Sequence, residues 1–279
     1  MAEILNGREV AAALDARTRE AAEMLREGGT VPCLAIVRVG DAADDIAYER
    51  QAGRKAEKLG IHVRRVRLAA EAPQQELLGA IRALNSDSLV HGILLLRPLP
   101  PHVDEDLVRN TLSPSKDVDG ITDYSMSGLF TGVGFQPCTA AACLAVLDHY
   151  GIDPAGRRAT VIGRSQVVGK PAAMMLLARD ATVTICHSRT ADLAAEARRA
   201  DILVAAMGRA GAVGADCMNE QQVILDVGIN VDEDGRLRGD VDYEAALQHA
   251  GAVTPVPGGV GTVTSSILMQ HVVTAAMGE

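Results

Sequence analysis

The stretch that decides the fold is "ATVIGRSQVVGKPAAMMLL", residues 159–177. A short apolar run leads into Gly163, and a helical pattern follows Gly169, with Pro171 near the first turn, where proline is tolerated. Glycines at a strand end and a helix start let the backbone approach a phosphate, which the helix N-terminus favours electrostatically. The spacing is Gly-x5-Gly and not GxGxxG. The loop alone therefore leaves a dinucleotide site and an ordinary strand-to-helix turn both open.

The segments around this loop predict an α/β protein with two domains. Strand candidates downstream are 181–187, 200–208 and 222–230, spaced by segments that can hold crossover helices. Such short apolar runs with little alternation suit a parallel sheet covered on both faces, as in a Rossmann-type domain. Upstream, helical patterns at 8–28, 47–60 and 74–86 alternate with strand candidates at 33–40, 62–69 and 90–100. That alternation indicates a second open α/β sheet, and 279 residues suffice for two cores.

Composition argues against several classes of partner. The net charge of -9, four tyrosines, two phenylalanines and no tryptophan disfavour nucleic-acid binding. No apolar run approaches the roughly 18 residues of a membrane span, and "MAEILNGREV" lacks a signal-peptide pattern, so we expect a cytoplasmic protein without membrane contact. Five cysteines without a CxxC pair argue against a disulfide framework and a metal site, and we interpret most of them as small buried residues.

The end of the second strand bears on the choice of cofactor. The strand at 181–187 runs into His187-Ser188-Arg189-Thr190, where an NAD-preferring site usually carries an acidic residue. Hydroxyl and basic groups there, with Arg164 and Ser165 on the first loop, suit a 2′-phosphate instead. We therefore predict NADP as the cofactor. The alternative is that Ser188 and Arg189 belong to a solvated loop.

Eight segments together resemble one family. They are "PSKDVDGIT", "PCT", "VIGRSQVVGKP", "CHSRT", "ADILVAAMGRAG", "ILDVGIN", "GDVDY" and "TPVPGGVGT". In order and spacing, over nearly the whole chain, they resemble the bifunctional methylenetetrahydrofolate dehydrogenase/methenyltetrahydrofolate cyclohydrolases of one-carbon metabolism. The resemblance implies a folate-binding catalytic α/β domain (1–138 plus 262–279), a Rossmann NADP-binding domain (139–261) and a cleft between them. It also implies a homodimer formed through the Rossmann domain.

The family's reaction oxidises 5,10-methylenetetrahydrofolate by hydride transfer to the nicotinamide, then hydrolyses the methenyl cation to 10-formyltetrahydrofolate. By resemblance, Asp119 holds the pterin's amino and ring N–H groups, since a carboxylate can accept two such bonds. Tyr48 matches the tyrosine that lies against the folate. The resemblance further implies substrate contacts from Pro257, Gly258 and Gly259, and cofactor contacts from Gly163, Arg164, Ser165, Gly169, Ser188, Arg189 and Gly208. A turn-forming aspartate and a core tyrosine are the structural alternatives for Asp119 and Tyr48.

The chain departs from the family where acid–base chemistry is performed. The family's catalytic lysine lies one helical turn after the tyrosine, and that position is Ala52. The glutamine that partners this lysine is replaced by Leu96, and a serine three residues before the tyrosine by Asp45. Hydride transfer needs alignment and no protein base, whereas hydrolysis needs proton transfers. We therefore expect a dehydrogenase with weak or absent cyclohydrolase activity.

The same residues also fit other interpretations. Lys55 has a stem long enough to reach back into the vacated space, although a solvated surface lysine is the favoured interpretation. A diverged paralogue that oxidises another pterin or an imine-like substrate, and a catalytically silent NADP or folate binder, also fit. The presence of Asp119 and Tyr48 favours folate. Gly53, in mid-helix at a cost of about 1 kcal/mol relative to alanine, has no account from sequence beyond close packing.

Overall fold

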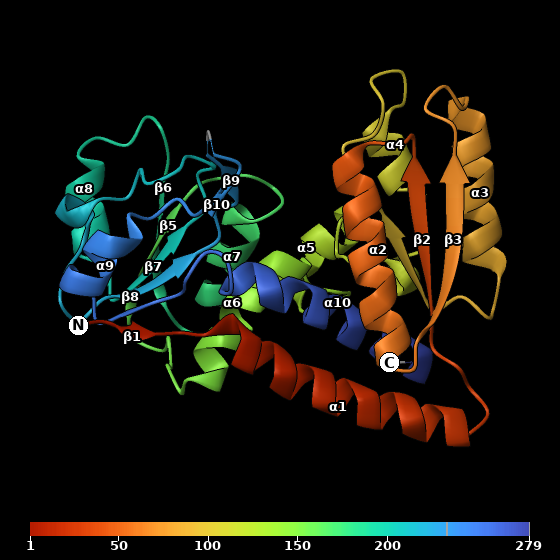
Figure 1. The fold of residues 1–279 in the computed structure, drawn as a ribbon, viewed down its shortest axis with the longest axis horizontal. Helices are drawn as coiled ribbons and strands as arrows, with labels where there is room; N and C mark the ends of the chain where they lie inside the picture. Colours follow the sequence, from red (N-terminus) through yellow and green to blue (C-terminus); the bar gives the residue numbers. More distant parts are fainter. Residues whose placement is uncertain (233, 279) are drawn as a thin grey trace. The chain divides into compact units, whose positions relative to one another are not determined.

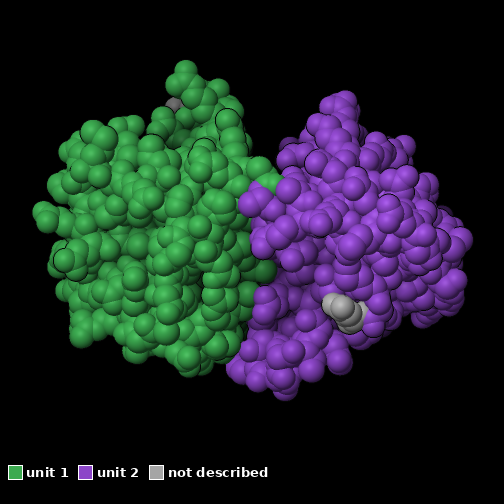
Figure 2. All heavy atoms as spheres, turned by 90° about the horizontal axis from the view of Figure 1, so that it is seen from below, with its two compact units in different colours: residues 1–12, 139–264 green, residues 13–138, 265–279 purple. Residues whose placement is uncertain are grey.

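The computed structural model describes residues 1–232 and 234–278, which form two compact units coloured separately in Figure 2. Unit 1 comprises residues 1–12 and 139–264, and unit 2 comprises residues 13–138 and 265–279. The division expected from the sequence differs from these units at residues 1–12 and at residues 262–264. Strand β1 (Glu3–Ile4) pairs in parallel with β11 (Ala252–Val253), which ties residues 1–12 to unit 1.

Unit 1 is built on a six-stranded parallel sheet with the order β1-β11-β8-β7-β5-β6. Figure 1 labels each of these strands except β11. Its longer strands are β5 (Arg158–Ile162), β6 (Thr182–Cys186), β7 (Ile202–Ala205) and β8 (Val223–Asp226). Every residue of β7 and β8 is buried, as expected for a parallel sheet covered on both faces. The predicted Rossmann-type parallel sheet is thereby confirmed.

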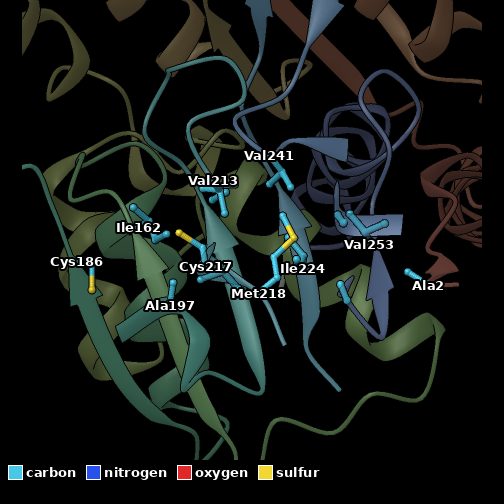
Figure 3. Close-up of a cluster of buried hydrophobic side chains, with 14 residues drawn as sticks. Ala2, Ile162, Cys186, Ala197, Val213, Cys217, Met218, Ile224, Val241 and Val253 are labelled. Atoms are coloured by element: carbon cyan, nitrogen blue, oxygen red, sulfur yellow. The ribbon is translucent and has the colours of Figure 1, made fainter. Parts of the chain in front are cut away.

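The helices of unit 1 are α6 (Cys138–His149), α7 (Gly169–Leu177), α8 (Leu193–Arg198) and α9 (Tyr243–His249). A short 3-10 helix η2 (Ala215–Cys217) and an antiparallel pair, β9 (Asn230–Val231) and β10 (Leu237–Arg238), complete it. Figure 3 shows a core cluster that includes Ile224 and Val253 of the sheet and Ala197 of α8. Cys186 and Cys217 lie in this cluster, and all five cysteines are buried and free, as the sequence predicted.

Unit 2 contains a three-stranded parallel sheet, β3-β2-β4, formed by β3 (His62–Leu68), β2 (Cys33–Val39) and β4 (Gly92–Leu95). One face of β2 packs against α3 (Gln74–Ser86) in a cluster that includes Ala35, Val37 and Ile81. The side chain of Arg38, next along the strand, points to the opposite face and bonds to α2 (Ala43–Lys58). The expected parallel α/β sheet is confirmed here too.

Helix α2 is fixed to the sheet by a buried ion cluster. Glu49 is only 4% exposed, and its carboxylate accepts bonds from Arg38 Nε at 2.8 Å and Arg67 Nε at 3.0 Å. Burial alone raises the pKa of Glu49, but the bonds from Arg67 and Arg38 outweigh it and lower that pKa. A Cβ on Gly53 would lie 2.6 Å from Nη2 of Arg65. The end of the Arg65 side chain, a third arginine beside α2, thus fills the space that a Cβ on Gly53 would occupy.

The remaining elements are α1 (Gly7–Glu27), α4 (Glu105–Arg109), η1 (Pro114–Lys116), α5 (Asp123–Thr131) and α10 (Val260–Met277). Although no apolar run of membrane-spanning length was expected, α10 is long and apolar enough by length and composition to cross a membrane. Half of that 18-residue span is buried inside the protein, including Leu268 and Val272. The buried core helix of a water-soluble protein meets the same criterion, so the composition of α10 is weak support for a span.

Candidate active site

A cavity of about 290 Å³ lies in unit 2 between the first turns of α2 and the end of β4. Four of the positions singled out in the sequence, Asp45, Tyr48, Leu96 and Asp119, line it together. Its other lining residues are Asp44, Leu94, Leu95 and Arg97. Acidic residues in the first turn of a helix are stabilised by the helix dipole, which suits the start of α2, where no side chain caps the helix.

The loop that carries Asp119 is held by a second, fully buried aspartate. Asp117 accepts hydrogen bonds from Thr122 N at 2.8 Å and Ser125 Oγ at 2.6 Å. Gly120 follows Asp119 with φ of 70°, a left-handed conformation that favours glycine. The two aspartates of the motif "KDVDGIT" therefore have different roles: Asp117 fixes the turn, and Asp119 lines the cavity. Sequence reasoning assigned no role to Asp117, although its motif was recognised.

The electrostatics of the cavity centre on Asp119. Burial raises the pKa of Asp119 to about 6; Asp117 also raises it, whereas Arg97 and a bond from Cys138 oppose the shift. Burial, with Asp119 nearby, also raises the pKa of Tyr48, which stays a neutral phenol. At pH 7 the cavity thus offers an ionised carboxylate that accepts N–H donors and a flat neutral ring.

Arg97 was missed by the sequence reasoning. It ends the apolar run of β4, and its Nη1 lies 3.3 Å from Oε1 of Glu105. Its side chain lines the cavity beside Asp119 and is 21% exposed. The signal that would have found it is a basic residue directly after the apolar run at residues 93–96.

In unit 1, the loop between β5 and α7 has the bare backbone that a phosphate site needs. Gly163 has φ of 136°, and a Cβ there would lie 2.1 Å from the carbonyl oxygen of Ala206. A Cβ on Gly169 would lie 2.3 Å from Gly163 O. Ser165 Oγ accepts hydrogen bonds from the N–H groups of Val168 (3.1 Å) and Gly169 (3.3 Å), which orders the start of α7. These residues fit a dinucleotide's phosphates at a helix N-terminus.

The turn after β6 presents the groups predicted to select NADP. His187 N donates to Thr190 Oγ1 at 2.8 Å, and Arg189 N donates to His187 Nδ1 at 3.1 Å, so the turn is internally braced. Ser188 and Arg189 are exposed, as is Arg164. Within residues 1–232 and 234–278, neither Arg164 nor Arg189 forms an ion pair, so both guanidinium groups are available for an anion.

The comparisons with known proteins decide the family. The profile "Tetrahydrofolate dehydrogenase/cyclohydrolase, NAD(P)-binding domain" matches residues 137–279, and the profile of the same family's catalytic domain matches residues 5–119. The chain belongs to the tetrahydrofolate dehydrogenase/cyclohydrolase family. The resemblance noted in the sequence is therefore confirmed, and with it a domain that binds a nicotinamide dinucleotide.

Relatives of this family match over the full length. The chain is 48% identical to the bifunctional protein FolD of Moorella thermoacetica over 276 residues, 99% of each chain, and 45% identical to that of Paracidovorax citrulli, covering 99% and 98%. The solved structure of the bifunctional FolD from Campylobacter jejuni has a TM-score of 0.97 at 37% identity, covering 100% and 99%. The Trypanosoma brucei FolD, complexed with NADP cofactor and inhibitor, has a TM-score of 0.92 at 33% identity, covering 99% and 97%.

In this chain, the positions of the family's catalytic lysine and glutamine are both apolar and buried. Ala52 lies one turn after Tyr48 on α2 and is completely buried, and Leu96 is 5% exposed. Neither side chain can donate or accept a proton. The family's lysine has not shifted to the next position along α2, because the residues after Ala52 are Gly53 and the exposed Arg54.

Lys55, considered as a substitute, is neither a solvated surface residue nor directed into the cavity. Its Nζ lies 3.1 Å from Asp15 Oδ1 and donates a hydrogen bond to Ser266 Oγ, and the side chain is only 18% exposed. The favoured interpretation of Lys55 as solvated was therefore wrong. An ammonium group held by two oxygens of α1 and α10 is kept away from the cavity that Tyr48 lines.

Cys138 is the remaining nucleophilic group near Asp119. Its Sγ donates to Val118 O at 3.3 Å and lies 3.7 Å from His271 Nδ1. Burial, reinforced by the charge of Asp119, raises the pKa of Cys138 well above its ordinary value. The group is a thiol at neutral pH, which is a poor nucleophile.

The motifs "ILDVGIN" and "GDVDY" brace the loop that carries Gly208. The fully buried Asp240 accepts hydrogen bonds at Oδ2 from Met207 N (2.6 Å) and Gly208 N (2.9 Å). Asp226 in turn accepts from the N–H of Asp240 at 2.9 Å. Burial raises the pKa of Asp226 to about 6, although the N–H donors oppose that shift. Sequence reasoning recognised both motifs but did not assign these roles.

The glycine-rich loop before α10 is tightly packed within unit 1. Gly7 N donates to Gly258 O at 2.8 Å, and the Val256–Pro257 peptide is cis. A Cβ on Gly259 would lie 2.4 Å from Pro255 O. The glycines are therefore needed for packing whatever else they contact, and the predicted contacts of Pro257, Gly258 and Gly259 with substrate stay a prediction.

Proposed function

We propose that the protein is an NADP-dependent methylenetetrahydrofolate dehydrogenase whose methenyltetrahydrofolate cyclohydrolase activity is weak or absent. The observation that carries the proposal is the composition of the 290 Å³ cavity. It retains Tyr48 and Asp119, the residues expected to bind folate, but Leu96 lines it at the family's glutamine position, and the buried Ala52 occupies the lysine position one turn after Tyr48. Binding groups are kept and proton-transfer groups are missing.

In the oxidation, the chain's own residues bind and align. Asp119, ionised above about pH 6, accepts the pterin's amino and ring N–H groups, and the neutral ring of Tyr48 packs against the folate. Gly163, Ser165 and Gly169 hold the dinucleotide. NADP, when bound, supplies the hydride acceptor. The folate nitrogens supply the electrons that expel the hydride, so alignment suffices and no protein base is required.

Hydrolysis of the methenyl cation makes different demands. A water must lose a proton as it attacks, and a folate nitrogen must gain one as the ring opens, which is general acid–base work. In this proposal Asp119 is occupied by the pterin, Lys55 is held by Asp15, and Cys138 is a protonated thiol. Losing such assistance typically lowers a rate about 10²- to 10⁴-fold.

The proposal includes a preference for NADP over NAD, supported by the exposed Arg189 and Ser188 after β6. Replacing Arg189→Ala is expected to raise the KM for NADP about 10- to 100-fold, because a hydrogen bond to a charged group contributes about 1.5–3 kcal/mol. The KM for NAD, which lacks the 2′-phosphate, should change little in the same variant. Steady-state kinetics with both dinucleotides measures this, and equal losses for the two would contradict the assignment of Arg189.

The proposal also includes a cytoplasmic homodimer formed through unit 1. Strand β6 ends the six-stranded sheet, and it carries the 37% exposed Ile185, while Leu177 of α7 is 53% exposed. An open edge with exposed apolar side chains favours association. Light scattering should give twice the 29.2 kDa of one chain, and Ile185→Asp should shift the mass toward one chain. The matched variant Val31→Asp, at another exposed apolar residue, should stay dimeric. A monomeric wild-type chain would contradict this part.

A second candidate function is the oxidation of a different pterin or imine-like substrate. Arg97 and Asp45 favour it, because both place charges in the cavity and Asp45 replaces the family's serine. The two functions separate in one assay. Reduction of NADP that depends on 5,10-methylenetetrahydrofolate supports the dehydrogenase. A folded protein that binds NADP but does not reduce it with this substrate would favour the second candidate or a silent binder.

A further inference from the structure

Next to the cavity, α2 forms one wall of a separate groove of about 490 Å³. We call it the basic groove; it is lined by Arg50, Arg54, Lys55 and Lys58 of α2, together with Ala47, Gln51 and Asp15. All of these residues belong to unit 2. The basic groove therefore has four cationic side chains and one carboxylate.

Most of this positive charge is uncompensated. Asp15 pairs with Lys55 at 3.1 Å, but Arg50, Arg54 and Lys58 form no ion pair among the residues that the structure describes. Elsewhere on α2 the reverse holds, since Glu49 is surrounded by arginines. In a chain of net charge -9, three unpaired cations along one groove form a local anion-attracting surface.

The basic groove lies directly beside Tyr48. Ala47 precedes Tyr48, and Gln51 follows it by three residues, so both neighbour the tyrosine on the helix surface. At 100° per residue, positions 47, 50, 51, 54 and 58 share one side of α2. A ligand that lies against Tyr48 and extends along α2 toward Lys58 therefore passes the three unpaired cations.

We propose that the basic groove binds the oligo-γ-glutamate tail of the folate substrate, an inference that rests on the proposed function. A folate ends in a glutamate, and each further γ-linked glutamate adds one carboxylate along a flexible chain. Guanidinium groups pair with carboxylates in a bidentate manner, and Arg50 and Arg54 lie one helical turn apart. The tail thus matches the basic groove in charge, in extended shape and in its starting point at Tyr48.

The test compares substrates of different tail length. At low ionic strength, the KM of the wild-type chain for the triglutamate form of 5,10-methylenetetrahydrofolate should be about 5- to 30-fold below that for the monoglutamate, since several exposed ion pairs act together. This preference should shrink as salt is added. The double variant Arg50→Gln/Arg54→Gln should lose the preference to within about twofold. The matched control Arg17→Gln/Arg82→Gln removes two exposed arginines outside the groove and should keep it.

Three outcomes would overturn the inference. The first is equal KM values for the two tails in the wild-type chain, and the second is a groove variant that keeps the full preference. The third is an α-linked glutamate peptide that inhibits as strongly as a γ-linked one of the same charge, which would indicate a general polyanion surface. Absence of NADP reduction with both substrates would instead contradict the proposed function. The inference is then tested by calorimetric titration with p-aminobenzoyl-tri-γ-glutamate, which should bind the wild-type chain and the control and not the groove variant.

Discussion

The double variant Ala52→Lys/Leu96→Gln is expected to hydrolyse methenyltetrahydrofolate about 10²-fold faster than the wild-type chain, and up to about 10⁴-fold if the restored pair is fully aligned. Ala52 is buried one turn after Tyr48, and a long side chain on a helix leans toward the N-terminus, here toward the cavity. Leu96 already lines that cavity. The decay of the methenyl absorbance, corrected for the enzyme-free rate, measures the gain.

The single variants are the controls for this pair. Leu96→Gln alone leaves a buried amide without its partner, at a cost of about 1–3 kcal/mol of folding stability. Ala52→Lys alone buries an ammonium group that lacks the glutamine. Each should therefore gain less than the pair, and a thermal melt should show the pair to be more stable than the sum of the singles predicts. A stable double variant without any gain would mean that other cavity residues, such as Asp45 and Arg97, have also changed the reaction.

The variant Asp119→Asn is expected to lower kcat/KM for the folate substrate about 10²- to 10³-fold, because one side of a buried charge-assisted contact is lost. The dehydrogenase of the wild-type chain should also depend on pH. Since the pKa of Asp119 is about 6, kcat/KM should fall about tenfold per pH unit below that value as the carboxylate is protonated. Initial rates measured from about pH 5 to about pH 8 test this dependence.

Stability provides the control for Asp119→Asn. The folded pKa of Asp119 lies above its ordinary value of 3.8, so its ionisation destabilises the folded state as the pH rises through about 6. Removing the charge should leave stability at pH 7 equal or higher, while the KM for NADP stays the same. Loss of folding in this variant, or a flat wild-type pH profile, would contradict the role given to Asp119.

Much of the fold follows from periodicity. Helices α1 and α3 and strands β2 and β3 lie within a residue or two of their predicted bounds. In such long segments the spacing of apolar residues reflects which side chains are buried. Strands β1 and β11 are two residues each and exist only through their pairing, so no local pattern predicts them. The same pairing explains why the compact units differ from the expected division at residues 1–12.

The site residues that lie within recognised sequence segments were predictable from the sequence. The cavity does bring Tyr48, Leu96 and Asp119 together, and recognition of their segments required only the sequence. The partners of Lys55 were not predictable, since Asp15 and Ser266 are far from it in the sequence. The space beside Gly53 is likewise filled by Arg65 of β3, which no local pattern indicates. Contacts of this kind are decided by tertiary packing, which one sequence does not display.

The most direct test of the central claim follows two products in one time course. The wild-type chain is given 5,10-methylenetetrahydrofolate and NADP, and reduced nicotinamide and methenyltetrahydrofolate are recorded separately, beside an enzyme-free hydrolysis control. We predict that NADP is reduced and that the methenyl product accumulates and decays no faster than in the control. Decay clearly faster than the control would contradict the claim and would identify a base that replaces the lysine, for which Asp45 in the cavity is the first residue to substitute.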